Sequence, residues 1–310
     1  MEKIAVYGAG TIGSAQATLV IGHGIPCVLI GNSERGMDRC KKAIAQNWDD
    51  LIAEGLATQA NKAAAMKLLT VTNDPAALTG ATFVFEAVSE EREQKRKVYE
   101  TVERFAAPDA VIASCTSSID AEELAAFVSR PETLIIAHPF QPVHMLPLVE
   151  VVKHRRTAEQ TVERTLAILG TLHRQVVVLN RSVPGLLINR FAQALFRESI
   201  YLIEQGVTTA ADIDKAVKYA VGMRYASIGL LEYYDAVGFG LEKAIAENVY
   251  PDLCDTKEIQ KTTLEGLASG RSGQADGQGL FDWSVKDADD FRRRKQAPYF
   301  EGVREWTMPE

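Results

Sequence analysis

A glycine-spaced loop near the start of the chain constrains the fold more than any other feature. Gly8-Ala9-Gly10-Thr11-Ile12-Gly13 follows an apolar run, Ile4–Tyr7, and opens a helical pattern, Thr11–His23. In such a unit the first glycine makes the turn, the second lets the backbone approach a pyrophosphate, and the third lets helix and strand pack closely. The helix N-terminus also offers free N–H groups to the phosphates. The alternative is an ordinary glycine-rich turn, but strand, loop and helix together predict a dinucleotide site.

Short apolar runs alternate with helical patterns over the first part of the chain. The runs are four to six residues long and mostly apolar throughout, as in strands that helices cover on both faces. Helical patterns at Glu34–Leu56, Glu90–Phe105 and Glu159–Leu172 separate several of them. This alternation predicts right-handed strand–helix–strand units and a doubly wound parallel sheet. The runs are Ile4–Tyr7, Cys27–Ile30, Leu69–Thr72, Phe83–Ala87, Val111–Ser114, Leu134–His138, Leu148–Val152 and Val176–Leu179.

The second part of the chain has a different character, because no strand-like run follows Leu179. We expect an α/β dinucleotide-binding domain of the Rossmann type over residues 1–183 and an all-α domain over residues 184–310. Pro184 suits the first turn of a helix, since its missing N–H would be unpaired there. Amphipathic helical patterns follow it at Gly185–Gly206, Ala210–Val221, Leu241–Glu247 and Ile259–Leu267.

Composition excludes several classes of protein. The 310 residues include 34 Lys and Arg against 41 Asp and Glu, and neither part is basic, which argues against a nucleic-acid or anionic-membrane surface. No apolar stretch reaches the length of a membrane span, and no signal peptide is expected before the first strand. The four cysteines are too sparse for a disulfide framework or a metal site, so we expect a cytoplasmic protein without a metal.

The end of the second predicted strand bears on the cofactor. Dinucleotide folds carry a carboxylate there that binds the adenosine ribose, whereas Cys27–Ile30 is followed by Gly31-Asn32-Ser33-Glu34-Arg35. Asn32, Ser33 and Arg35 can donate to a 2′-phosphate, which a carboxylate would repel. The pattern therefore accepts NAD or NADP and favours NADP. Two interpretations compete: Glu34 binds the ribose, or Arg35 lies on a solvated helix face.

A histidine and a glutamate twelve residues apart form the candidate proton-transfer pair. His138 ends the run Leu134–His138, and Glu150 lies inside the apolar run Leu148–Val152. A carboxylate in an apolar strand is costly to bury without a partner, and a histidine at a strand end beside a nucleotide site is a suitable one. Glu150 would orient the imidazole and stabilise its charged form. The alternative is a structural histidine next to prolines.

At this point the chain resembles the L-3-hydroxyacyl-CoA dehydrogenase superfamily over nearly its whole length. That family has a His, an Asn-Pro pair and, twelve residues after the His, a Glu in a Leu-Val-Glu-Val run, matched here by His138, Gln141-Pro142 and Glu150. Six motifs in order are specific, where any one alone would not be. The others are Glu86-Ala87 with Glu90 and Lys95, Thr116-Ser117-Ser118, Pro184-Gly185 with Asn189-Arg190, Asp212-Ile213-Asp214 with Gly222, and Gly277-Gln278-Gly279 with Phe281.

The resemblance implies hydride transfer at a secondary alcohol β to a carboxyl or thioester group. His138 is then the general base in oxidation and the acid in reduction, and Glu150 holds its other ring nitrogen. Ser117 and Asn189 hydrogen-bond the reacting oxygen, although turns and helix starts also favour these residue types.

The resemblance also assigns a cofactor contact and exposes two departures. Glu90 and Lys95 lie near the nicotinamide ribose in this reading. Gln141 replaces the family's usual Asn, so its contact with the substrate or with His138 must be rearranged. Gly31 replaces the acidic residue of the second strand. A homodimer formed through the helical domain is a further expectation.

The segment Gly222-Met223-Arg224-Tyr225-Ala226 bears on the substrate. It is similar to the branch related to L-gulonate 3-dehydrogenase and λ-crystallin, whose turn contains the same residues. A guanidinium in the cleft is a suitable partner for a substrate carboxylate, because its planar fork can bind both oxygens. The alternative role for Arg224 is an ion pair between subunits. Lys62 and Lys67 could meet CoA phosphates, and a solvated helix face explains them equally well.

Three functions stay open after this reading. The favoured one is an NAD(P)-dependent dehydrogenase that interconverts a small polar 3-hydroxy acid, resembling L-gulonate, with its 3-keto form. The second is a short-chain L-3-hydroxyacyl-CoA dehydrogenase of the 3-hydroxybutyryl-CoA type in fatty-acid metabolism. The third is a non-catalytic nucleotide-binding or crystallin-like protein, against which the joint presence of His138, Glu150, Ser117 and Asn189 argues.

Overall fold

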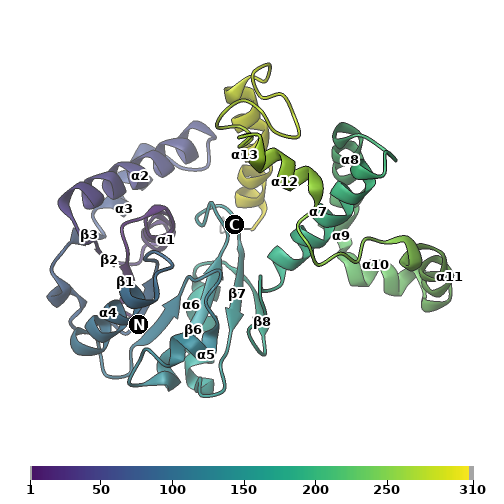
Figure 1. The fold of residues 1–310 in the computed structure, drawn as a ribbon. Helices are drawn as coiled ribbons and strands as arrows, with labels where there is room; N and C mark the ends of the chain where they lie inside the picture. Colours follow the sequence, from purple (N-terminus) through teal and green to yellow (C-terminus); the bar gives the residue numbers. More distant parts are fainter. Residues whose placement is uncertain (1, 307–310) are drawn as a thin grey trace. The chain divides into compact units, whose positions relative to one another are not determined.

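Within residues 2–306, which the computed structural model describes, eight strands form one sheet in the order β3-β2-β1-β4-β5-β6-β7-β8 (Figure 1). Each strand lies within one residue of an apolar run in the sequence. The bounds are β1 (Ile4–Tyr7), β2 (Cys27–Ile30), β3 (Leu69–Thr72), β4 (Phe83–Glu86), β5 (Val111–Ser114), β6 (Leu134–Pro139), β7 (Leu148–Val152) and β8 (Gln175–Leu179).

The sheet departs from the expected parallel arrangement at β7. Every neighbouring pair among β1 to β6 is parallel, whereas β7 pairs antiparallel with β6, and β8 pairs parallel with β7. The physical reason is the length of the connection, because a parallel crossover needs about a dozen residues or more, and only residues 140–147 separate β6 from β7. The chain therefore reverses and β7 returns beside β6.

Helices cover both faces of the sheet, so its apolar strands are buried from two sides. One core cluster joins the sheet to α1, α2 and α6 through residues such as Leu19, Ile44 and Leu169. The other joins it to α4 and α5 through residues such as Tyr99 and Leu124. This is the doubly wound arrangement that the sequence predicts. The helices of this part are α1 (Thr11–Gly22), α2 (Glu34–Ala53), α3 (Gln59–Met66), α4 (Arg92–Phe105), α5 (Ala121–Ala125) and α6 (Glu159–Thr171).

The second part of the chain is helical, as the sequence predicts. Over residues 188–291, all of which the structure describes, the only β-structure consists of two isolated bridges at Gly273↔Gln278 and Gln278↔Asp282. The helices are α7 (Ile188–Glu204), α8 (Ala210–Ala216), a π-helical turn (Val217–Gly222), α9 (Met223–Ile228), α10 (Leu230–Val237), α11 (Phe239–Val249) and α12 (Lys261–Ala268).

Contacts divide the described chain into two units. Unit 1 contains residues 2–187 and 292–306, and unit 2 is Ile188–Phe291. Most of α13 (Ala288–Trp306) belongs to unit 1, where Phe300 and Val303 pack against Leu56 and Met145. The sequence predicts a helical domain over residues 184–310, which would include these residues. No helix in the described residues combines the length and apolar character needed to cross a bilayer.

Candidate active site

The glycine loop is shaped by contacts that exclude side chains at two positions. Gly8 has a φ of 127°, and a Cβ there would lie 2.4 Å from the Ala87 carbonyl oxygen. A Cβ on Gly13 would lie 1.8 Å from the carbonyl oxygen of Gly8. At Gly10 a Cβ would meet nothing within 4 Å. Gly8 and Gly13 therefore build the turn between β1 and α1, whereas Gly10 leaves open space at the helix N-terminus, where Thr11 and Ile12 begin α1.

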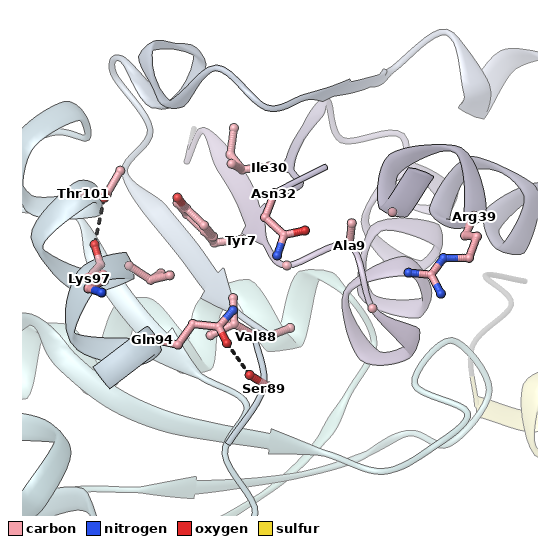
Figure 2. Close-up of a pocket in the computed structure, with 15 residues that line it drawn as sticks. Tyr7, Ala9, Ile30, Asn32, Arg39, Val88, Ser89, Gln94, Lys97 and Thr101 are labelled. Carbon is pink, nitrogen blue, oxygen red and sulfur yellow. Dashed lines mark hydrogen bonds between the residues drawn. The ribbon is translucent and has the colours of Figure 1, made fainter. Parts of the chain in front are cut away.

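A pocket of about 490 Å³ opens beside this loop at the point where β1 lies between β2 and β4. Such a switch point of an α/β sheet is where dinucleotides bind. Asn32 lies between the wall that carries Arg39 from α2 and the wall that carries Lys97 and Thr101 from α4 (Figure 2). No carboxylate occurs among the fifteen lining residues, all of which are described by the structure. The loop and pocket fit the diphosphate and adenosine part of NAD or NADP.

Two residues near the end of β2, Met37 and Arg39, were not identified from the sequence. A Cβ on Gly31 would lie 2.5 Å from Met37 Cγ, so the Met37 side chain occupies the place of the expected carboxylate. Ser33 caps α2 and accepts a hydrogen bond from the Gly36 amide at 3.2 Å. Arg35 is exposed, and Arg39, one helical turn later, lines the pocket instead. Arg39 could have been found from the sequence, because residues four apart lie on the same face of a helix and Arg39 follows Arg35 at that spacing.

A buried ion pair supports the loop after β4. Lys95 and Glu86 are 1% and 0% exposed, and Lys95 Nζ lies 2.8 Å from Glu86 Oε1. The Tyr99 hydroxyl and the Ser114 hydroxyl donate to Glu86 Oε2 at 2.8 and 2.7 Å. The Val88 amide donates to Oε1 at 2.9 Å. These contacts satisfy a carboxylate that would otherwise be costly to bury.

Glu90 joins this pair to the residues after β5. Its carboxylate accepts hydrogen bonds from the Thr116 hydroxyl at 2.9 Å and from the Ser117 amide and hydroxyl at 2.7 and 3.2 Å, and Lys95 Nζ lies 3.5 Å away. Partial burial raises the pKa of Glu90, but the Ser117 amide, the Lys95 charge and the two hydroxyls together bring it below its usual value. Glu90, Lys95 and Ser117 thus lie together, with Lys95 fully buried.

His138 and Glu150 form the expected pair. His138 Nδ1 lies 2.8 Å from Glu150 Oε2, and Glu150 Oε1 accepts a hydrogen bond from the Leu187 amide at 2.7 Å. The side chains are 9% and 0% exposed, and the ring of Phe140 packs edge-on against the imidazole at 4.8 Å. Because Nδ1 faces the carboxylate, Nε2 is the ring nitrogen that remains for another partner.

The remaining predicted residues are exposed. Gln141 precedes a cis peptide bond to Pro142 in unit 1. Asn189 lies in the first turn of α7, and Arg224 lies on α9, both in unit 2. The Arg224 guanidinium stacks over the Tyr233 ring at 4.5 Å. No group of three or more metal-ligating side chains occurs among the described residues.

Family models match both parts of the chain. A model described as the 3-hydroxyacyl-CoA dehydrogenase NAD binding domain covers residues 3–182, and one described as the 3-hydroxyacyl-CoA dehydrogenase C-terminal domain covers residues 185–283. The chain is 35% identical to the L-carnitine dehydrogenase of Staphylococcus epidermidis over 87% of each protein. It is 29% identical to the 5-formyl-3-hydroxy-2-methylpyridine 4-carboxylate 5-dehydrogenase of Mesorhizobium japonicum over 91% of this chain and 90% of that protein.

Solved structures agree with these matches. A crystal structure of an NAD⁺-dependent 5-formyl-3-hydroxy-2-methylpyridine 4-carboxylic acid 5-dehydrogenase has a TM-score of 0.87 at 27% identity, over 98% of each chain. The (S)-3-hydroxybutyryl-CoA dehydrogenase PaaH1 from Ralstonia eutropha has a TM-score of 0.75 at 27% identity, over 90% of this chain and 98% of that one. The chain therefore belongs to the 3-hydroxyacyl-CoA dehydrogenase family of NAD-dependent oxidoreductases.

Proposed function

We propose that the protein interconverts the 3-hydroxyl group of a small polar free acid and the corresponding ketone, with His138 as the proton-transfer residue. The observation that carries the proposal is the buried pair of His138 Nδ1 and Glu150 Oε2, which leaves Nε2 for the substrate hydroxyl. In oxidation His138 takes the hydroxyl proton, and the Glu150 carboxylate stabilises the resulting imidazolium. When bound, the nicotinamide supplies the hydride acceptor.

Two further residues are proposed to hold the reacting oxygen. The Ser117 hydroxyl lies 3.2 Å from the Glu90 oxygen to which the Ser117 amide already donates at 2.7 Å, so the hydroxyl proton can turn from Glu90 and donate to the substrate oxygen. Asn189 offers its amide from the first turn of α7. We assign both to the substrate oxygen, and we assign Glu90 to the nicotinamide ribose, with the buried Lys95 positioning Glu90.

Arg224 is the residue that supports a free acid, rather than a thioester, as the substrate. Among the described residues the Arg224 guanidinium stacks on the ring of Tyr233 and forms no ion pair. A cation without a counter-ion suits a substrate carboxylate. The relatives above are named for L-carnitine and for a pyridine carboxylate, both of which are free acids. L-carnitine and L-gulonate, each a 3-hydroxy acid, are therefore the first substrates to test.

The acyl-CoA alternative rests on the similarity to 3-hydroxybutyryl-CoA dehydrogenases. One of its two candidate phosphate contacts is already engaged, because Lys62 Nζ pairs with Asp49 at 2.6 Å. Lys67 is exposed at the end of α3. The free acid is thus the better-supported class.

For the cofactor, the pocket favours the 2′-phosphate of NADP. Arg39 and Lys97 line it, no carboxylate does, and Met37 fills the place of the ribose-binding acid. The family model and a solved relative are described as binding NAD, which makes NADH the competing outcome. Arg39→Ala should raise KM for NADPH about tenfold, with a smaller effect on NADH, and Arg35→Ala serves as the matched control.

We also propose a homodimer formed through unit 2. Apart from Leu166 and Val178, every large apolar side chain found exposed among the described residues lies in unit 2, with Leu231 and Phe239 each 81% exposed. Apolar surface on this scale marks an interface. Phe239→Glu should yield monomers in analytical ultracentrifugation, whereas Val178→Glu on β8 should leave the dimer intact.

A cytoplasmic location remains the expected one. Cys27, Cys40, Cys115 and Cys254 all carry free thiols. Free, mostly buried thiols are typical of a reducing compartment.

The substrate test compares L-carnitine, L-gulonate and acetoacetyl-CoA with each cofactor. Arg224→Ala should raise KM for the accepted acid at least tenfold, and Arg224→Lys should restore part of the loss. Lys218→Ala is the matched control, because Lys218 also stacks on a tyrosine of unit 2, Tyr219 at 5.1 Å. Efficient reduction of acetoacetyl-CoA that is insensitive to Arg224→Ala would favour the thioester. Turnover that survives His138→Ala would favour a non-catalytic role for the site.

A further inference from the structure

A second pocket, of about 670 Å³, lies in unit 1. Its walls come from the C-terminal half of α1 and the turn after it, from α2, α3 and their connection, from the segment between β6 and β7, from residues 171–174 before β8, and from Val303 of α13. None of its lining residues belongs to the nucleotide pocket or to the predicted catalytic set. It has the size of a small-molecule site.

Arg174 provides a buried positive charge in this pocket. It is 5% exposed, and it donates through Nε to the Leu172 carbonyl at 2.7 Å and through Nη1 to the carbonyls of Val143 and Leu146 at 3.3 and 3.2 Å. Among the described residues, its buried Nη2 has no hydrogen-bond partner and the guanidinium forms no ion pair. Burial lowers the pKa of Arg174 to about 10, so it is charged at neutral pH. A buried cation of this kind is costly unless an anion compensates it.

Two more residues of the same pocket have buried polar atoms without a partner among the described residues. Trp48 is 6% exposed, and no described residue accepts a hydrogen bond from its Nε1. Both ring nitrogens of His144 are buried and make no hydrogen bond to a described residue. Burial, followed by the charge of Arg174, lowers the pKa of His144 to about 4, which leaves the ring neutral at pH 7 with one N–H to donate. Buried polar groups are nearly always paired in native proteins, so three such groups lining one pocket point to a ligand.

The rest of the lining indicates what the ligand carries beside its charge. Leu19, Leu51 and Leu56 contribute apolar side chains, and no Asp or Glu lines the pocket. Because Arg174, Trp48 and His144 all line this apolar pocket, we propose a binding site for a monocarboxylate on a small apolar body. The guanidinium and the indole N–H bind the carboxylate, and the leucines pack on the apolar part.

The ligand would touch the segment that joins the proton-transfer pair. Arg174 donates hydrogen bonds to the carbonyls of Val143 and Leu146, and His144 lies between these two residues in the sequence. Val143, His144 and Leu146 all belong to the connection from His138 to Glu150. The binding proposal itself does not depend on the proposed function, because it is tested without substrate turnover.

Calorimetric titration of the full-length protein with benzoate and hexanoate, each against benzyl alcohol and hexanol, tests the site. We expect the acids to bind and the alcohols to bind at least tenfold more weakly. Trp48→Phe keeps an aromatic ring and removes the N–H, so it should weaken benzoate binding about tenfold or more. Trp283→Phe in unit 2 is the matched control and should leave the affinity unchanged.

Arg174→Met should abolish binding, and Arg174→Lys should retain part of it. Should Arg174→Met not fold, Trp48→Phe carries the test alone. Saturating NADH or NADPH should leave benzoate binding unaffected. Equal binding of acid and alcohol, binding of inorganic phosphate in preference to both acids, an unchanged affinity in Trp48→Phe, or competition with the dinucleotide would each overturn the proposal.

Discussion

His138 and Glu150 are direct partners across the antiparallel pair of β6 and β7, and their side chains meet at 2.8 Å between Nδ1 and Oε2. Their separation of twelve residues follows from this geometry, because the chain leaves β6 just after His138, turns through residues 140–147 and passes Glu150 on the way back. The reversal of β7 thus brings the acid to the base, which a helical crossover at the same place would not do.

Glu150→Gln should lower kcat about 10²- to 10⁴-fold while the protein remains folded. The glutamine oxygen can still accept the Leu187 amide, whereas its NH₂ group then faces His138 Nδ1 and favours the wrong tautomer. Steady-state kinetics measures the loss. Glu122→Gln, at an exposed position on α5, is the control and should retain full activity. A wild-type kcat in Glu150→Gln would contradict the assigned role.

Two glycines of the loop should respond differently to alanine. Gly13→Ala puts a Cβ 1.8 Å from the Gly8 carbonyl oxygen, so the variant should be destabilised by several kcal/mol or fail to fold. Gly10→Ala meets no atom within 4 Å, so it should fold normally and lose dinucleotide affinity at least tenfold. Thermal unfolding and dinucleotide titration separate the two effects. Equal stability of both variants would argue against this division.

Lys95→Met should lower the free energy of unfolding by about 3–5 kcal/mol, because it leaves the buried Glu86 carboxylate without its cation. The double variant Glu86→Gln with Lys95→Met should recover part of that loss. Lys97→Met on the same helix removes only an exposed contact with Glu93 and should cost less than about 1 kcal/mol. Urea denaturation gives all three values, and a small effect of Lys95→Met would be inconsistent with the buried pair.

His144 should make the protein less stable as the pH falls from about 6.5 to about 4. Burial lowers its folded-state pKa from 6.5 to about 4, so between these values the unfolded chain binds more protons than the folded one. The contribution is complete above pH 6.5 and is lost on acidification, by up to about 3 kcal/mol. His144→Phe should remove this part of the slope. Urea denaturation as a function of pH compares the two proteins, and parallel curves would contradict the assignment.

The strands could be predicted well because each is a short apolar run buried on both faces, and Gly8, Gly13, His138 and Glu150 occupy the expected positions. The direction of β7 could not be read from its own residues, since the length of the connection determines it. The stretch that contains α3 was expected to be helical, with Lys62 and Lys67 on a solvated face, although its sequence QANKAAAM lacks an apolar stripe. α13 is strongly charged and contains Pro298, so it gave no helical signal.

Some residues that line the two pockets could not be predicted either, because tertiary packing and not local sequence places them there. Arg39, Lys97 and Arg174 are ordinary basic residues in the sequence, and only the packing of α2, α4 and β8 brings them to pockets. Glu34–Leu56 was expected to be one helix, whereas α2 ends at Ala53 and Gly55 follows with a φ of 70°. A glycine in that conformation ends a helix, and the periodic pattern of apolar residues does not reveal it.

The return of α13 makes unit 1 discontinuous in sequence. The chain leaves it after Leu187 and rejoins it at Arg292. A fragment that stops at residue 187 would lack Phe300 and Val303, leaving Leu56 and Met145 without their packing partners. The dinucleotide-binding unit is therefore complete only after α13 has been synthesised, so unit 2 is an insertion held at both ends, and a truncation that removes Phe300 and Val303 would damage the nucleotide-binding unit rather than its neighbour.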